Sequence, residues 1–236
     1  MISTEQNIAL LTIGNEAIKK SEWVDFGNYC FEREKGLRKE AFRYLDSFLT
    51  STQHWSDDNK IEFAKFLFPF FETLPQADYA TFPKPLSEKL LEPTLLNWCE
   101  MEKEDYSPFR WYGKYYRSED HLLKALEICP TDDIARQVLI EWWTYHIYYS
   151  VHHLPEGYIG DPKDDIKLGE KIKLQISQLT TNELREYWFK ELEEDLILVE
   201  NYIDWQVSGN PSFEKWGEEN KKQTGYGLTR VYYYEK

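Results

Sequence analysis

The chain has 236 residues and a net charge of −14; 42% of its residues are apolar and 17% are aromatic. This composition is that of a folded protein with a sizeable core, not of a disordered chain. The negative charge would repel nucleic acid and anionic membranes, so we expect neither as a partner, whereas it permits a basic protein partner.

The chain has no apolar stretch near the roughly 18–20 residues that span a bilayer. Residues 1–20 show no basic stretch before the first apolar run and no small-residue cleavage site, which argues against a signal peptide. We therefore expect a cytoplasmic protein. The three cysteines are widely spaced and odd in number, which is not the pattern of a disulfide framework or a zinc ribbon, so each is expected to be a reduced thiol in the core. They are Cys30, Cys99 and Cys129.

Apolar residues recur at helical spacing along most of the chain. The expected helices cover residues 4–19, 21–35, 37–51, 56–68, 87–99, 122–128, 132–153, 163–178 and 182–207. Ser3 and Gln6 form a capping box before the first helix, and Ser56 is an N-cap for the fourth. Pro69 is expected to stop that fourth helix. Three prolines between residues 74 and 86 predict a loop.

The end of the chain has a different character. Gly209, Asn210 and Pro211 are expected to end the last helix. The stretch "GYGLTRVYYYEK" (225–236) is rich in residues that favour an extended backbone. The sequence therefore predicts an all-α domain over 1–208, built of stacked antiparallel helical hairpins, and a C-terminal tail over 209–236 that lies against the domain or is exposed.

A hairpin pattern appears in "WVDFGNYCFEREKGLRKEAFRYLDSFL", which resembles a tetratricopeptide repeat. Its large and small residues match that family's offsets if the turn is about two residues longer than usual, with cysteine in the place of a usual tyrosine. The residues concerned are Trp23, Phe26, Gly27, Cys30, Ala41 and Leu45.

A second partial match is "LLKALEICPTDD" (122–133), in which Ala125 and Pro130 stand at the positions expected near the end of a repeat. The first helix of this repeat is not evident from the sequence. The resemblance implies a superhelix with a concave surface that binds proteins or peptides, and it does not imply an enzyme. The alternative is an irregular helical bundle.

Three of the five histidines fall in "YHIYYSVHHLPEGYIGDPKDD" (145–165). His146 and His153 are about two helical turns apart, so they do not readily share one metal ion. Paired imidazoles at the end of a helix are favoured by the negative end of its dipole. We expect no metal and no cofactor here. Carboxylate runs, such as those between residues 191 and 195, are read as solvated helix faces.

Tyrosine and tryptophan provide rigid contact area, so part of this aromatic stretch is expected to line a binding surface while most of its rings are core. The candidate binding residues are Trp142, Tyr145, His146, Tyr149, His152, His153, Tyr158 and Asp161. No phosphate-binding loop, nucleophile elbow or dinucleotide fingerprint accompanies them.

Our leading hypothesis is a non-enzymatic protein-binding module, in its most concrete form an acidic immunity or adaptor protein that masks a basic partner. One alternative is a hydrolase on a helical scaffold that uses histidine and carboxylate residues around 146–165. Another is a structural subunit of an assembly, for which a large exposed apolar patch would be the sign.

Overall fold

The structure is a computed structural model in which residues 3–226 are described. Every regular element within them is helical, which confirms the all-α prediction. The chain divides into two compact units, Met1–Ile128 and Cys129–Lys236. Sequence analysis places its only boundary later, after residue 208, and part of the expected tail, Phe213–Asn220, forms a helix. The extended conformation expected for residues 227–236 lies outside the described residues.

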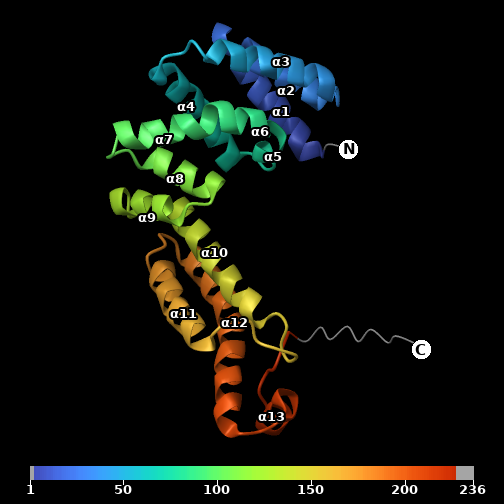
Figure 1. Cartoon of the computed structure of the whole chain (residues 1–236), viewed down its shortest axis with the longest axis vertical. Helices are drawn as coiled ribbons and strands as arrows, with labels where there is room; N and C mark the ends of the chain where they lie inside the picture. The colour runs from blue at the N-terminus through green and yellow to red at the C-terminus, as the bar shows by residue number, and fades with distance from the viewer. Residues whose placement is uncertain (1–2, 227–236) are drawn as a thin grey trace, which may run out of the picture. The chain divides into compact units, whose positions relative to one another are not determined.

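The first unit is a series of helices in which most neighbours along the chain pack as antiparallel pairs. Figure 1 shows α1, α2 and α3 side by side, and α8 pairs with α9 in the same way. The helices are α1 (Thr4–Ala17), α2 (Val24–Glu34), α3 (Arg38–Thr52), α4 (Asp57–Thr73), α5 (Ala77–Thr81), α6 (Lys84–Leu86), α7 (Glu92–Met101), α8 (Tyr106–Tyr116) and α9 (Glu119–Ile128).

The start signals in the sequence are confirmed. Ser3 and Gln6 form the capping box of α1, with both reciprocal hydrogen bonds present. The side chain of Ser56 accepts a hydrogen bond from the backbone N–H of Asn59 at the start of α4. These caps satisfy N–H groups that have no partner within the helix, which is why the two helices begin where the sequence predicts.

Aromatic rings fill the centre of this unit. Phe26, Phe48 and Phe63 come from α2, α3 and α4, and their ring centroids lie 4.9–5.4 Å apart. All three side chains are fully buried. Offset and edge-to-face ring contacts of this kind add to the free energy gained by burying apolar area. The three helices are therefore joined by a single aromatic cluster.

The residues of the segment 23–49 that resemble a tetratricopeptide repeat are buried; Trp23 lies in a 3-10 turn just before α2, and the others lie in α2 and α3. Gly27 makes a close helix–helix approach, because a Cβ at this position would lie 2.4 Å from Ile18 Cγ2. Ile18 is the C-cap of α1, so the approach is made to α1 and not to α3. None of these contacts tests the family resemblance, which stays a prediction.

Two predictions about chain breaks are wrong. Helix α4 continues through Pro69 to Thr73, and residues 74–86 contain the short helices α5 and α6 instead of an unbroken loop. Tertiary packing explains why α4 continues through Pro69. Phe68 stacks on Trp111 of α8 with ring centroids 5.1 Å apart, and Glu72 forms an ion pair of 2.9 Å with Arg110 of the same helix.

The sequence does not reveal which helix precedes the repeat-like segment 122–133. In the structure that helix is α8. Its C-terminal half packs closely on α9. The space at Gly113 shows this, since a Cβ there would lie 2.6 Å from Leu122 Cγ. Its sequence "YSPFRWYGKYY" does carry apolar and aromatic residues at helical spacing, a signal that sequence analysis overlooked. Burial of Phe109 and Trp111 fixes it in the fold.

A π-helical turn, Ser87–Leu91, leads into α7. The prolyl nitrogen of Pro93 has no proton, so it cannot donate the α-helical hydrogen bond to the carbonyl of Lys89, and its ring crowds that carbonyl. The backbone N–H of Glu92 bonds to the carbonyl of Ser87, which is the wider spacing of a π-helix. Pro93 then falls in the first turn of α7, the position that tolerates proline.

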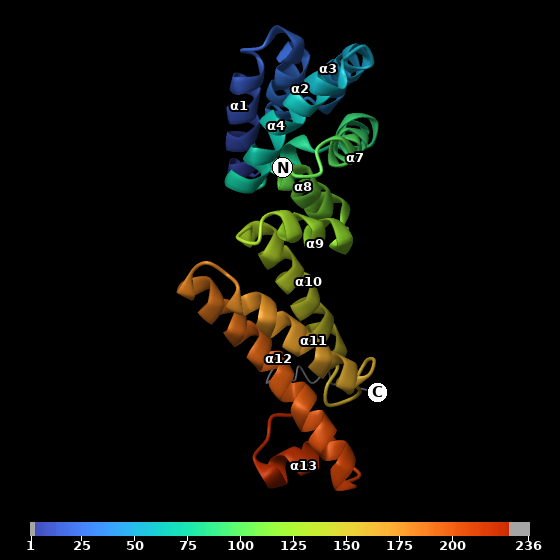
Figure 2. The ribbon, with the colours of Figure 1, turned by 90° about the vertical axis from the view of Figure 1, so that its left-hand side faces the viewer.

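The second unit is built on three long helices and one short one. Figure 2 shows α10, α11 and α12 packed along one another, with α13 near the end of α12. Their bounds are α10 (Asp133–Val151), α11 (Pro162–Ser177), α12 (Asn182–Ser208) and α13 (Phe213–Asn220). For the helix expected over 182–207 the sequence offers Thr180 or Thr181 as the N-cap, and in the structure Thr181 is the cap of α12.

A buried arginine ties α10 to α11. The guanidinium of Arg136 donates hydrogen bonds to the side-chain oxygens of Gln175 and Gln178 and to the carbonyl of Pro130. Asp133, in the first turn of α10, accepts hydrogen bonds from Thr180 in the connection between α11 and α12. A buried charge is tolerated only when it is well hydrogen-bonded, so these contacts set the position of the start of α10.

The cysteines are free thiols, but not all of them are core. Cys30 and Cys99 are buried, as expected. Burial raises the pKa of both thiols, that of Cys99 to about 12, because the thiolate loses hydration there. Cys129 is half-buried, so the prediction of a core thiol is wrong at this position. It lies in the non-helical segment after α9.

A substitution at Gly27 tests the close approach of α2 to α1. Alanine usually stabilises a helix interior relative to glycine by about 1 kcal/mol. Gly27→Ala should instead lower the free energy of unfolding by about 1–3 kcal/mol, because the new Cβ clashes with Ile18 and with the carbonyl of Gly14. Urea denaturation followed by tryptophan fluorescence measures this. The control is Gly157→Ala, where the added Cβ meets nothing within 4 Å; equal effects would contradict the close packing.

Candidate functional site

Helix α10 exposes a continuous surface of tyrosine and histidine rings near its C-terminal end. Tyr145 is 64% exposed and Tyr149 is 51% exposed. Neighbouring ring centroids lie between 4.0 and 5.8 Å apart along the series. We define the tyrosine–histidine face by these residues: Tyr145, Tyr148, Tyr149, His152 and His153. Exposed rings held on a rigid helix provide contact area at low cost in conformational entropy.

The C-terminal end of this face is fixed by the backbone. Helix α10 ends at Val151, as predicted from the His152-His153 pair and Pro155. The Nδ1 atom of His152 lies 2.7 Å from the carbonyl oxygen of Tyr149. Imidazoles close to the last carbonyl groups of a helix are favourably placed in its dipole, most of all when protonated. The histidines therefore have a structural reason to be there as well as an exposed surface.

A buried carboxylate lies beside the face. Asp165 of α11 is buried and accepts a hydrogen bond of 2.5 Å from the hydroxyl of Tyr158. The Nε2 atom of His146, whose ring is largely exposed, lies 3.8 Å from its other oxygen. Tyr158 in turn stacks on Tyr202 of α12. Burial and the Asp165 carboxylate both raise the pKa of the Tyr158 hydroxyl, which therefore stays a hydrogen-bond donor.

A second buried carboxylate has the same arrangement. Asp195 of α12 accepts a hydrogen bond from the hydroxyl of Tyr226, and Tyr226 packs on Tyr148 with ring centroids 5.6 Å apart. Burial raises the pKa of Asp195 to about 6; the hydrogen bond from Tyr226 opposes this increase, while the nearby charges of Glu194 and Glu191 add to it. Burial also raises the pKa of Tyr226. The carboxylate and the tyrosine thus join α12 to the tyrosine–histidine face.

Residues 221–226 reach Tyr148 because they run back along α12. The side-chain amide of Asn201 donates a hydrogen bond of 2.9 Å to the carbonyl of Gln223. Gly225 comes so close to the loop after α10 that a Cβ there would lie 2.7 Å from the carbonyl oxygen of Leu154. These contacts hold Tyr226 in place.

The structure brings together most, though not all, of the candidate binding residues. Tyr145, Tyr149, His152 and His153 belong to the tyrosine–histidine face, and His146 and Tyr158 meet at Asp165. Trp142 is half-buried. Asp161 is the N-cap of α11, where its carboxylate accepts a hydrogen bond of 2.9 Å from the N–H of Lys163. Its role in the structure is therefore to start α11.

Sequence reasoning missed Asp195 as part of this site. The sequence predicts that the carboxylates between residues 191 and 195 form one solvated face, but Asp195 is buried. The signal was available, because Asp195 lies on the apolar stripe that Leu192 and Val199 form at helical spacing. A charged residue on such a stripe indicates a buried polar contact. Tyr226 carries no comparable signal, since its partner is 31 residues away in sequence.

A groove of about 350 Å³ lies on α11 and α12. Its floor is apolar, formed by Leu192 and Leu196, and two large side chains, Phe189 and Ile197, are each 39% exposed at its edge. The remaining lining residues are charged: Lys173, Glu193 and Glu200. Sequence analysis did not identify this surface, because its residues come from two helices.

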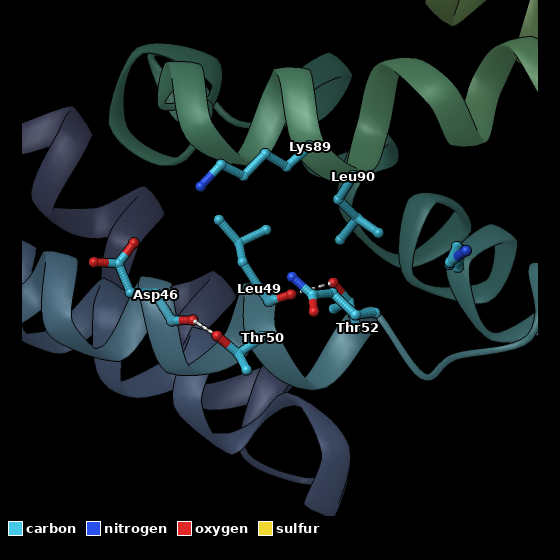
Figure 3. A pocket seen from close by; sticks show the side chains of 8 residues that line it. Asp46, Leu49, Thr50, Thr52, Lys89 and Leu90 are labelled. Atoms are coloured by element: carbon cyan, nitrogen blue, oxygen red, sulfur yellow. Dashed lines mark hydrogen bonds between the residues drawn. The ribbon is translucent and has the colours of Figure 1, made fainter.

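The first unit has a cavity of about 450 Å³ between α3, the start of α4 and the π-helical turn. Figure 3 shows Leu49 and Leu90 facing each other across it, with Asp46 and Thr50 on α3 and Lys89 on the π-helical turn. The hydroxyl of Thr50 donates to the backbone carbonyl of Asp46. The cavity thus has both charge signs at its edge and apolar side chains between them.

Among the described residues, no group of three or more His, Cys, Asp or Glu side chains is arranged to hold a metal ion. Within residues 3–226, no helix has both the length and the apolar character that crossing a membrane requires.

Comparison with known proteins gives little help. No family model matches the chain, and no solved structure matches it. Among curated proteins, the chain is similar to RxLR effector protein BLN06 of Bremia lactucae, with 26% identity over 176 residues. The match covers 75% of this chain and 28% of that protein, so the chain spans little more than a quarter of the length of the relative it matches.

The raised pKa of Asp195 makes stability depend on pH. Because the folded pKa, about 6, lies above the value of 3.8 for the unfolded group, stability falls as pH rises between these values. Asp195→Asn should stabilise the protein by about 1–2 kcal/mol at pH 7.5 and have almost no effect at pH 4. Urea denaturation at both pH values measures this. Asp204→Asn, an exposed position on the same helix, is the control; an Asp195→Asn effect that does not change with pH would refute the raised pKa.

Proposed function

We propose that the chain is a non-enzymatic protein-binding module and that the tyrosine–histidine face of α10 is its contact surface. The observation that carries the proposal is the row of largely exposed rings from Tyr145 on α10 to His153 just beyond the end of that helix. Tyrosine is among the residues enriched at the energetic centres of protein interfaces. Single exposed apolar residues are ordinary, but a contiguous group is typical of an interaction site.

The charge of the second unit favours a basic partner. Residues 129–236 contain 20 acidic and 12 basic side chains. The carboxylates of Asp165 and Asp195 lie directly behind the face, and among the described residues neither forms an ion pair with lysine or arginine. Tyrosine rings attract lysine and arginine side chains through their π electrons. A basic segment would therefore be attracted at long range by the charge and at contact by the rings.

The similarity to a protein named as an effector supports a role in which the chain acts on another protein. The proposed role as an adaptor or immunity protein that masks a basic partner is a finer form of the same hypothesis. A concave tetratricopeptide-like surface, if the repeat resemblance is correct, would serve the same purpose.

The hydrolase alternative rests on His146 and Asp165. Their distance of 3.8 Å is longer than a hydrogen bond, and the second oxygen of Asp165 is engaged by Tyr158. The cavity and the groove described above are lined by other residues. The geometry therefore supports binding better than it supports general acid–base chemistry by this pair.

The double variant Tyr145→Ala/Tyr149→Ala tests the proposed surface. Immobilised full-length protein should retain a basic partner from native lysate at low salt and release it at high salt. The double variant should bind the partner about 30-fold more weakly or worse, because central aromatic side chains contribute about 1–2 kcal/mol each at an interface. Quantitative mass spectrometry of the bound proteins measures this.

The matched control is Tyr79→Ala, a tyrosine of the first unit that is 75% exposed. Circular dichroism checks that each variant is folded. If the double variant retained the partner as well as the Tyr79→Ala control does, the tyrosine–histidine face would not be the contact surface.

A further inference from the structure

The groove on the α11–α12 hairpin is a second unpartnered surface, made of residues that the tyrosine–histidine face does not use. Its floor residues Leu192 and Leu196 are buried in the hairpin, where Leu196 packs against Gly169 of α11. Phe189 and Ile197 remain 39% exposed at its edge. Large apolar side chains half-exposed around a groove of about 350 Å³ leave apolar area that a partner would remove from water.

The shape of the groove fits a helix. Its α12 residues run from Phe189 to Glu200, which is three helical turns or about 16 Å along the helix axis. A partner helix lying in the furrow between two helices would present residues at i, i+3, i+4 and i+7 to it over the same length. Among the described residues there is no strand, so no sheet edge is available for an extended peptide to pair with.

The acidic residues around the groove favour a partner with positive charge. Helix α12 carries eight acidic and two basic side chains between Asn182 and Ser208. Glu193 and Glu200 line the groove itself, and neither forms an ion pair in the described part of the chain. The third charged residue, Lys173, is held by Glu170 at 2.9 Å, which offsets its charge. Positive side chains beside an apolar stripe would complement this edge.

We infer that the α11–α12 groove binds an amphipathic α-helix of a partner protein, with an apolar stripe toward Leu192, Leu196 and Ile197 and lysine or arginine residues toward Glu193 and Glu200. The inference rests on the proposed protein-binding role but uses a different surface. It makes the second unit a module with two contact regions, one aromatic and one apolar. A partner that occupies both would gain affinity from the linkage.

The probe is a fluorescein-labelled peptide of about 16 residues, long enough for four helical turns, with leucine at the helical stripe positions and lysine elsewhere. Fluorescence anisotropy against the full chain should show saturable binding. Ile197→Asp should weaken it by about tenfold or more, because a charge replaces a central apolar contact. Phe189→Ala, which introduces no charge, should weaken it in the same direction. Glu193→Gln/Glu200→Gln should weaken it by about threefold and reduce its salt dependence.

Val207→Asp is the matched control, since Val207 is 82% exposed on the same helix and does not line the groove. Its binding should equal that of the wild type. Equal weakening in Ile197→Asp and Val207→Asp would mean that the peptide does not depend on apolar contact in the groove, and would overturn the proposal. So would equally tight binding of a matched peptide with glutamate in place of lysine, or no binding at all.

Sedimentation equilibrium separates a second copy of the chain from a partner helix. A dimer that forms in the wild type and is lost in Ile197→Asp would assign the groove to self-association and overturn the helix proposal. The two proposals also fail separately. If the peptide does not bind while the lysate partner is still lost in Tyr145→Ala/Tyr149→Ala, the groove assignment is wrong and the tyrosine–histidine face stands.

Discussion

The packing of α10 against α11 and α12 is the constraint on which the candidate binding surface depends. The sequence of α10 is apolar or aromatic nearly all round, but a helix buries only the side chains that face its neighbours. Ile147 and Val151 are fully buried against those neighbours, whereas Tyr145 and Tyr149 lie on the side that no described element covers. Tyr145 and Tyr149 are exposed because α11 and α12 pack on other parts of α10, and the hydrogen bonds of Arg136 and Asp133 hold the start of α10 against these neighbours.

Two buried carboxylates give this unit its electrostatic character. Removing a carboxylate from water is unfavourable unless hydrogen bonds replace its hydration. Asp165 and Asp195 each accept such a bond from a tyrosine hydroxyl, which carries no charge of its own. Positive side chains of a bound partner would be attracted by the carboxylates of Asp165 and Asp195. For this reason we connect the buried acids with binding.

The first unit shows how tertiary packing overrides local signals. Pro69 should end a helix, but Phe68 and Glu72 hold the turns on either side of it against α8, and α4 continues. Pro93 produces the wider π-helical turn and brings Lys89 and Leu90 to the edge of the cavity in Figure 3. At Pro69, contacts made by residues far apart in sequence decide the outcome, whereas the π-helical turn follows from the local effect of Pro93. Local helix propensity describes only the tendency that these tertiary contacts oppose.

The sequence by itself determined the helical class, the start of several helices through Ser3, Ser56 and Thr181, and the end of α10 near His152, because periodicity and capping are local properties of the chain. It also placed most of the candidate residues, though not Tyr158 and Asp161, on one aromatic helix. Only the tertiary structure decided that Asp195 is buried, that Tyr226 returns to Tyr148, and that α11 and α12 form a groove. These features depend on which helix faces meet, and one sequence does not specify that pairing.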